Sequence, residues 1–246
     1  MTTRAGVATL PASHLPAKPT RAMRAFLMRG LSVTGVSLGM AVLPASALSA
    51  QTGGTCVPAS ERTGREFGCF ITSREELGPL PRRPKWYWHL DTYQSRAEAE
   101  AAKGERSTVV ESLGRVWLFT IAGAAWHPST GHREARIGPL PLVAAERYTA
   151  VYMEGIFQPG MQTVVHRHPG VEAWYTLEGG MCLETPEGIV RQVAGDPGKM
   201  VRAGLPMMLT GTGTRPRRSL VLILQDSSKP WLMLAPDWTP KGLCKQ

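Results

Sequence analysis

The chain has 246 residues, with 28 Lys and Arg against 19 Asp and Glu, which gives a formal net charge of +9. Five of the basic residues lie before residue 48, where there is no acidic residue, so 23 basic and 19 acidic residues remain in the rest of the chain. This balance is ordinary, and no basic stripe with interleaved aromatic side chains accompanies it. Nucleic acid is therefore excluded as an expected partner.

The first segment has the order of a secretory signal peptide. Three arginines precede an apolar run over residues 31–43, and Pro44-Ala-Ser-Ala47 then supplies an Ala-x-Ala cleavage site. The run is too short to cross a bilayer as a helix. We therefore predict a leader over residues 1–47 and a chain that is exported to the periplasm or secreted, with no stable membrane span after cleavage. A retained membrane anchor is the alternative.

All four cysteines follow the leader, at positions Cys56, Cys69, Cys182 and Cys244. An even number of cysteines in an exported chain predicts two disulfides, for which three connectivities exist. Cys56 and Cys69 are close enough in sequence to staple an N-terminal loop, and Cys244 can then pin the C-terminal tail to Cys182. A zinc cluster is the rival interpretation, but no Cys-x-x-Cys pair supports it.

Residues 48–106 are predicted to form an irregular N-terminal extension. A proline-rich connector spans residues 78–84 and the aromatic cluster Trp86-Tyr-Trp88 follows it. Both are expected to wrap the surface of a core formed further along the chain. One short helix is expected over residues 95–103, because Ser95 is a suitable N-cap and Gly104 a stop signal.

Residues 107–246 are predicted to form short strands between Gly and Pro turns, followed by a C-terminal tail. So many short strands at regular spacing indicate an all-β sandwich or barrel of jelly-roll type. The expected strands cover residues 108–111, 115–121, 148–157, 162–168, 172–177, 181–184, 189–193, 199–201, 206–210 and 220–225.

The stretch over residues 160–179 carries the candidate metal ligands. His166 and His168 share a face of an extended chain, about 7 Å apart along it. A Pro-Gly pair at residues 169–170 is a turn signal, so a hairpin brings Glu172 up on the next strand, facing the same way. Two imidazoles and a carboxylate around one point form a ligand set for a divalent transition metal. An exposed hairpin with solvated histidines is the alternative.

This stretch resembles the first motif of the cupin superfamily, which reads Gly, five residues, His-x-His, three or four residues, Glu, six residues, Gly. The motif is complete here, at Gly160, His166, His168, Glu172 and Gly179. The resemblance implies a single cupin-type jelly-roll β-barrel. It also implies one divalent transition metal (Fe, Mn, Cu, Ni or Zn), held by the two histidines and the glutamate.

The second cupin motif, which reads Gly, five residues, Pro-x-Gly, two residues, His, three residues, Asn, is degenerate. Its best match starts near Gly195, with Arg202 in place of the proline, Gly204 kept, Met207 in place of the histidine and Gly211 in place of the asparagine. Because that histidine is the fourth metal ligand of cupins, Met207 marks the candidate fourth position. A thioether there favours copper(I) over iron or manganese. Packing in the barrel core is the alternative role for this methionine.

Strand alternation predicts pocket residues beside the metal. Gln162 shares the face of His166, and Trp174 and Thr176 share the face of Glu172. The amide and the indole are thus expected to orient a small ligand, although the indole is equally suited to fill the core.

Two further groups have chemistry of their own. Arg215, Arg217 and Arg218 lie in a Gly/Thr-rich loop that either closes over the barrel mouth and attracts an anionic substrate or is simply solvated. The second group flanks a Pro-Ser-Thr-Gly turn and is assigned to the surface: His127, His132 and Glu134.

Two function classes follow from the resemblance. The first is an exported metalloenzyme that acts on a small organic molecule, since cupins include dioxygenases, decarboxylases, isomerases and epimerases. The second is a non-catalytic cupin that binds a small ligand or a protein, which the missing fourth ligand favours. The fold alone does not choose between them. We expect a small-molecule partner and allow for a homodimer.

Overall fold

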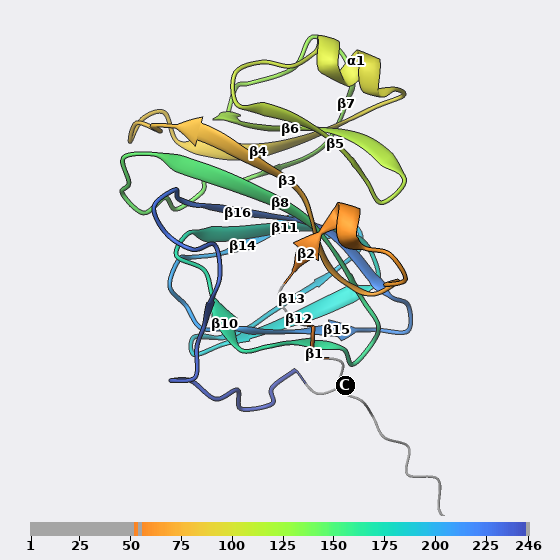
Figure 1. The fold of residues 1–246 in the computed structure, drawn as a ribbon, viewed down its shortest axis with the longest axis vertical. Helices are drawn as coiled ribbons and strands as arrows, with labels where there is room; N and C mark the ends of the chain where they lie inside the picture. Colours follow the sequence, from red (N-terminus) through yellow and green to blue (C-terminus); the bar gives the residue numbers. More distant parts are fainter. Residues whose placement is uncertain (1–51, 54–55, 245–246) are drawn as a thin grey trace, which may run out of the picture. The chain divides into compact units, whose positions relative to one another are not determined.

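The computed structural model describes residues 52–53 and 56–244 (Figure 1). The leader predicted over residues 1–47 lies outside them. The helices are the 3-10 turn η1 (Ala59–Glu61) and the α-helix α1 (Arg96–Ala101). The strands are β1 (Thr52–Gly53), β2 (Val57–Pro58), β3 (Gly68–Gly78), β4 (Trp86–Tyr93), β5 (Ser107–Ser112), β6 (Arg115–Gly123), β7 (His132–Ile137), β8 (Tyr148–Phe157), β9 (Gln162–Thr163), β10 (His166–Arg167), β11 (Val171–Glu178), β12 (Gly180–Thr185), β13 (Gly188–Val193), β14 (Lys199–Val201), β15 (Met208–Thr212), β16 (Arg217–Asp226) and β17 (Met233–Leu234).

A six-stranded sheet, in the order β14-β11-β16-β8-β3-β2, forms the middle of three β layers (Figure 1). Side chains of β8 alternate between two cores. Ala150 and Tyr152 pack in one apolar cluster, and Val151 and Met153 pack in another. All ten residues of β8 are buried as a result, because a sheet covered on both faces has no solvent side.

The five-stranded sheet, in the order β1-β9-β15-β12-β13, faces one side of the central sheet (Figure 1). Its side chains Met181, Leu183 and Leu209 pack in the same cluster as Val151 and Met153 of β8. Two facing and mainly antiparallel sheets around one apolar core confirm the all-β, jelly-roll expectation. The candidate metal centre lies between these two sheets.

The four-stranded sheet β5-β6-β4-β7 covers the other side of the central sheet (Figure 1). Here the structure differs from the irregular chain expected over residues 48–106. β3 joins the central sheet beside β8, and β4 pairs with both β6 and β7. The Trp86-Tyr-Trp88 cluster belongs to β4, and Trp88 is fully buried in the core instead of wrapping its surface. Buried and exposed residues do not alternate regularly along β3, because its pairing with β8 shifts register twice.

The predicted division between residues 106 and 107 falls between β4 and β5, which belong to one sheet. The helix expected over residues 95–103 is α1, which is shorter at its C-terminal end. Ser95 caps it as expected, since the Ser95 hydroxyl accepts a hydrogen bond from the Glu98 N–H at 3.3 Å.

Most predicted strands of the jelly roll are present, and those over residues 148–157 and 199–201 have the expected bounds. The strand expected over residues 162–168 is instead divided into β9 and β10. The chain changes partner there, because Gln162 pairs with Thr210 of β15 whereas His166 pairs with Leu234 of β17. A partner in the C-terminal tail is a long-range feature that local alternation does not reveal.

Two disulfides join the cysteine pairs expected from the sequence. The Cα atoms are 4.6 Å apart in Cys56–Cys69 and 5.6 Å apart in Cys182–Cys244. The first ties the segment before β3 to β3 itself, and the second ties β12 to the tail. Within the described part of the chain, no helix has the length and apolar character needed to cross a membrane.

Candidate metal centre

A short turn brings the three candidate ligands together. His166 lies on β10, His168 follows it, and Glu172 is the second residue of β11. Gly170 makes the turn possible, because a Cβ atom there would lie 2.1 Å from the Leu224 carbonyl oxygen of β16. The donor atoms of the two imidazoles and the carboxylate all lie within 4.8 Å of one another, and all three residues are buried.

Hydrogen bonds fix the orientation of both imidazoles. Nδ1 of His166 lies 2.7 Å from the Val164 carbonyl oxygen, and Nδ1 of His168 lies 2.6 Å from the Trp231 carbonyl oxygen. A carbonyl only accepts, so each Nδ1 carries the proton and each Nε2 keeps a free lone pair. This is the arrangement that metal-binding histidines adopt, with a backbone acceptor that sets the tautomer and the ring angle.

The imidazoles are neutral at ordinary pH. Burial lowers the pKa of His168 to about 4. Burial also lowers the pKa of His166, and the neighbouring His168 adds to this effect. Neutral imidazoles are the form that ligates metals.

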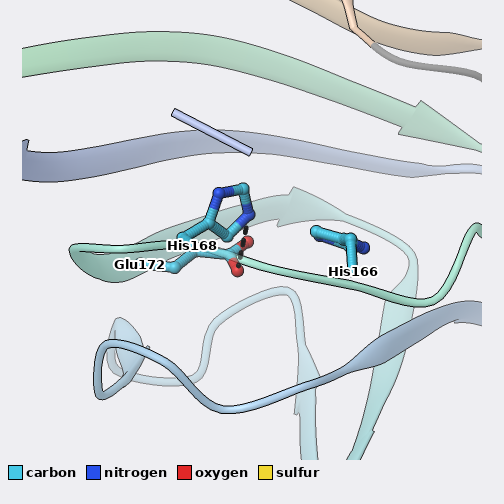
Figure 2. Close-up of side chains that lie close together, drawn as sticks. All are labelled: His166, His168 and Glu172. Atoms are coloured by element: carbon cyan, nitrogen blue, oxygen red, sulfur yellow. Dashed lines mark ion pairs between the residues drawn. The ribbon is translucent and has the colours of Figure 1, made fainter. Parts of the chain in front are cut away.

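Glu172 faces the histidines without a hydrogen-bond donor. Its Oε2 atom has no hydrogen-bond partner, although it lies 3.6 Å from Nε2 of His168 (Figure 2). Burial raises the pKa of Glu172. The arrangement leaves two acceptors, Nε2 and Oε2, facing each other in a buried place. A divalent cation between them satisfies both, so the donor set fits a transition metal.

A cavity of about 60 Å³ opens beside the three residues. Its wall is mainly apolar, with side chains from both facing sheets and from the tail: Met153, Phe157, Leu183, Met207, Leu209, Val221, Trp231 and Leu232. The Cys56–Cys69 disulfide also lines it. Polar lining side chains are Thr163, His166, His168, Glu172 and Arg217.

The predicted pocket residues lie outside the lining of this cavity. Gln162 donates a hydrogen bond to the Thr210 hydroxyl at 3.2 Å. Trp174 is fully buried in the core between the two sheets, and Thr176 donates to Gln192 at 2.6 Å. Alternation placed Trp174 and Thr176 on the face of Glu172, but each step of two residues moves about 7 Å along the strand, away from the turn.

Arg217 is a lining residue that the sequence interpretation placed in a loop. It begins β16 and is 2% exposed, while Arg215 and Arg218 form ion pairs with Glu178 outside the cavity. Alternation could have found it, since Arg217, Ser219 and Val221 share a face of the strand. The Gly-Thr-Gly-Thr sequence before it indicated a loop and hid this pattern.

The degenerate second motif runs beside the first. The backbone N–H of Met207 donates to the His166 carbonyl at 2.8 Å, and the N–H of Gly204 donates to the His168 carbonyl at the same distance. Met207 is 1% exposed and its side chain lines the cavity. The segment that was matched to the second motif thus lies beside His166 and His168, and the Met207 thioether lines the same cavity as the two imidazoles.

The residues around the Pro-Ser-Thr-Gly turn, His127, His132 and Glu134, lie away from the cavity, and both histidines are exposed as expected. His132 and Glu134 belong to β7, and only the residues before them form the turn. His132 is exposed. Neither residue lines the cavity.

No protein-family model matches the chain, and no curated protein is similar to it in sequence. Solved structures match part of it. One is a protein with a double-stranded β-helix domain from Klebsiella pneumoniae, with 18% identity over 35% of this chain and 74% of that chain and a TM-score of 0.31. Another is a cupin domain from Bordetella pertussis, with 22% identity over 31% of this chain and 81% of that chain and a TM-score of 0.28. A third is the L-ribose isomerase of Cellulomonas parahominis, with 16% identity over 33% of this chain and 51% of that chain and a TM-score of 0.29.

The first two of these structures are a protein with a double-stranded β-helix domain and a cupin domain. The three include an uncharacterised protein as well as an enzyme.

Proposed function

We propose that this chain is an exported, mononuclear-metal-binding cupin that acts on a small organic molecule, as a dioxygenase, decarboxylase or isomerase does. The observation that carries the proposal is the pair of facing acceptors, Nε2 of His168 and the unpartnered Oε2 of Glu172. A buried arrangement of this kind is costly unless a cation lies between the two atoms. The adjoining cavity gives a small molecule access to that cation.

The chain's own residues have distinct roles in this proposal. Nε2 of His166, Nε2 of His168 and the Glu172 carboxylate hold the metal, which when bound supplies Lewis-acid or redox chemistry to a molecule in the cavity. The Val164 and Trp231 carbonyls keep the two Nδ1 protons in place. The apolar wall excludes water and so strengthens electrostatic interactions inside the cavity.

Dedicated acid–base groups are scarce in this cavity. Among the described residues that line it, the ionisable side chains are the three candidate ligands and Arg217. A reaction here therefore relies on polarisation and orientation of the substrate more than on a separate general acid or base.

Metal analysis of protein isolated from its native compartment tests the proposal. We expect about one equivalent of a divalent transition metal per chain, measured by inductively coupled plasma mass spectrometry, because three ligands suffice to hold a metal with open positions. Met207→Leu should keep that metal, since a swap of similar volume costs under about 1.5 kcal/mol in packing. Met207→His should bind divalent metal more tightly by adding an imidazole.

The same experiment separates the alternatives. Loss of metal in Met207→Leu would make the thioether a ligand and favour copper. If neither the wild type nor Met207→His binds metal, the metalloenzyme proposal is rejected. A non-catalytic barrel that binds a small ligand or a protein, which the thioether at the fourth position favours, would then be the better description.

Export is supported by the two disulfides, because compartments beyond the cytoplasmic membrane do not keep thiols reduced. We expect the mature chain to begin between Leu48 and Thr52, after the Ala-x-Ala site. The intact mass of native protein measures this directly. A soluble native chain that retains residues 21–43 would contradict the proposal.

A further inference from the structure

Arg217 is a buried cation that forms no hydrogen bond or ion pair with any described residue, although the Glu172 carboxylate acts on its charge. The Nε and Nη2 atoms of its guanidinium are inaccessible to solvent and make no hydrogen bond. Its contact with an aromatic ring is to Phe157, whose centroid lies 5.8 Å from the guanidinium carbon. No carboxylate among the described residues forms an ion pair with it. A buried charge in this state is strongly unfavourable for the fold.

Other arginines in the described part of the chain that have buried nitrogens or buried partners form ion pairs with carboxylates. Arg106 and Arg167 also have a buried, unpartnered Nε, but each forms an ion pair through another nitrogen, with Glu105 and Asp237. Arg133 reaches the buried Asp91 at 2.6 Å. Among the described arginines with a buried, unbonded guanidinium nitrogen, Arg217 is therefore the one that has no ion pair.

The neighbouring strand leaves room for this guanidinium. Gly155 of β8 lies beside it, and a Cβ atom at that position would be 3.1 Å from Nη1 of Arg217 and 3.5 Å from the Phe157 ring. A side chain at position 155 would thus be in close steric contact with the Arg217 guanidinium. The absence of a side chain at Gly155 keeps the guanidinium at the edge of the cavity that also holds His166, His168 and Glu172.

We propose that Arg217 binds the carboxylate of the substrate, so that the substrate class is a small organic carboxylate. This inference rests on the proposed function for the identity of the site as a substrate site. A guanidinium donates charge-assisted hydrogen bonds to a carboxylate, and Arg217 lines the cavity without a hydrogen bond or ion pair to any described residue. The cavity of about 60 Å³ has room for roughly four to six water-sized groups, which suits a carboxylate with few further atoms.

The charge of the site agrees with an anionic substrate. A divalent metal beside the single Glu172 carboxylate leaves one positive charge, and Arg217 adds another. Burial lowers the pKa of Arg217 to about 10, against an opposing contribution from Glu172, so the side chain is charged at neutral pH. A carboxylate placed between the metal and the guanidinium neutralises part of this charge without adding a second protein acid to the cavity.

Binding of acetate and of its neutral isostere acetamide tests the inference by isothermal titration calorimetry, with protein loaded with zinc and with protein stripped by a chelator. We expect wild-type protein to bind acetate at least tenfold more tightly than acetamide. Arg217→Met should remove that preference. Arg217→Lys should weaken it, because a lysine keeps the positive charge but lacks the planar guanidinium and its additional N–H donors. Arg218→Met is the matched control, on the next residue of β16 but outside the cavity, and should leave acetate binding unchanged.

A stability measurement separates recognition from a structural role. In zinc-loaded protein the metal balances the Glu172 charge, so Arg217→Met removes a buried charge that has no ion pair, and its denaturation midpoint should equal or exceed that of the zinc-loaded wild type. A lowered midpoint together with unchanged acetate binding would make Arg217 a structural residue and overturn the inference. Tighter binding of inorganic phosphate than of acetate would overturn the carboxylate assignment.

Measurements on zinc-loaded and on metal-stripped protein distinguish failure of this inference from failure of the proposed function. If zinc never loads but the stripped protein still prefers acetate through Arg217, the anion site stands and the metal site fails. If zinc loads and the Arg217 variants bind acetate as the wild type does, the metal site stands and the inference fails.

Discussion

Glu172→Gln is expected to lower metal affinity by more than the ~10–100-fold that loss of an outer-shell partner costs. The neutral amide is a much weaker donor to a divalent cation than a carboxylate is. The remaining candidate ligands, His166 and His168, both lie on one short segment. Metal content after gel filtration and competition with a chromogenic chelator measure the change.

The metal-free protein supplies a control for folding. In Glu172→Gln the amide can donate a hydrogen bond to Nε2 of His168, which lies 3.6 Å from the carboxylate oxygen it replaces. The chelated variant should therefore unfold at the same denaturant concentration as the chelated wild type or at a higher one. Glu178→Gln, on the same strand but outside the cavity lining, should keep its metal and lose at most about 1 kcal/mol of stability with its ion pairs to Arg215 and Arg218. Full metal content with lost turnover in Glu172→Gln would make Glu172 a general acid or base.

The three candidate ligands could be predicted because their geometry is local. Only a turn separates His168 from Glu172, and the Pro-Gly pair within it determines which side chains converge. The jelly-roll class was also predictable, since the strands of the two facing sheets are bounded by Gly and Pro turns. β8 has its expected bounds because it is buried on both faces, so that most of its residues are apolar and the strand stands out in the sequence.

Features that depend on distant parts of the chain were not predictable in this way. The cavity wall includes Trp231 and Leu232 of the tail, and the acceptor that orients His168 is 63 residues away from it in sequence. Gln162 was predicted to line the pocket but lies outside the cavity lining, because the chain changes its pairing partner between β9 and β10. β4 was mistaken for a surface segment because the sheet that buries Trp88 is completed by β6 and β7, which come later in the chain.

The C-terminal tail consequently belongs to the candidate site. The Trp231 ring stacks on His168 with centroids 5.8 Å apart, and the Trp231 carbonyl accepts the Nδ1 hydrogen bond. Further along, the N–H of Ala235 donates to the Val165 carbonyl at 3.2 Å. The buried Glu184 carboxylate accepts hydrogen bonds from the N–H groups of Lys241 and Leu243. The Cys182–Cys244 disulfide then fixes the end of this segment to β12.

Removal of this disulfide by the double change Cys182→Ala and Cys244→Ala is expected to lower both stability and metal affinity. The bridge spans 62 residues, and the chain-entropy relation gives about 4 kcal/mol for a loop of that length. Metal affinity should fall because a looser tail no longer holds the Trp231 carbonyl against His168, and loss of such an outer-shell acceptor costs ~10–100-fold. Urea denaturation and chelator competition measure the two effects, and thiol titration of the denatured wild type should find no free thiol.

The other disulfide provides the comparison. Cys56–Cys69 spans 13 residues, for which the same relation gives about 3 kcal/mol, and it leaves the tail attached. Its removal should therefore destabilise the fold slightly less and reduce metal affinity much less than removal of Cys182–Cys244. Equal losses of metal affinity in the two double variants would refute a specific role for the tail. They would mean that the orientation of His168 depends on overall stability alone.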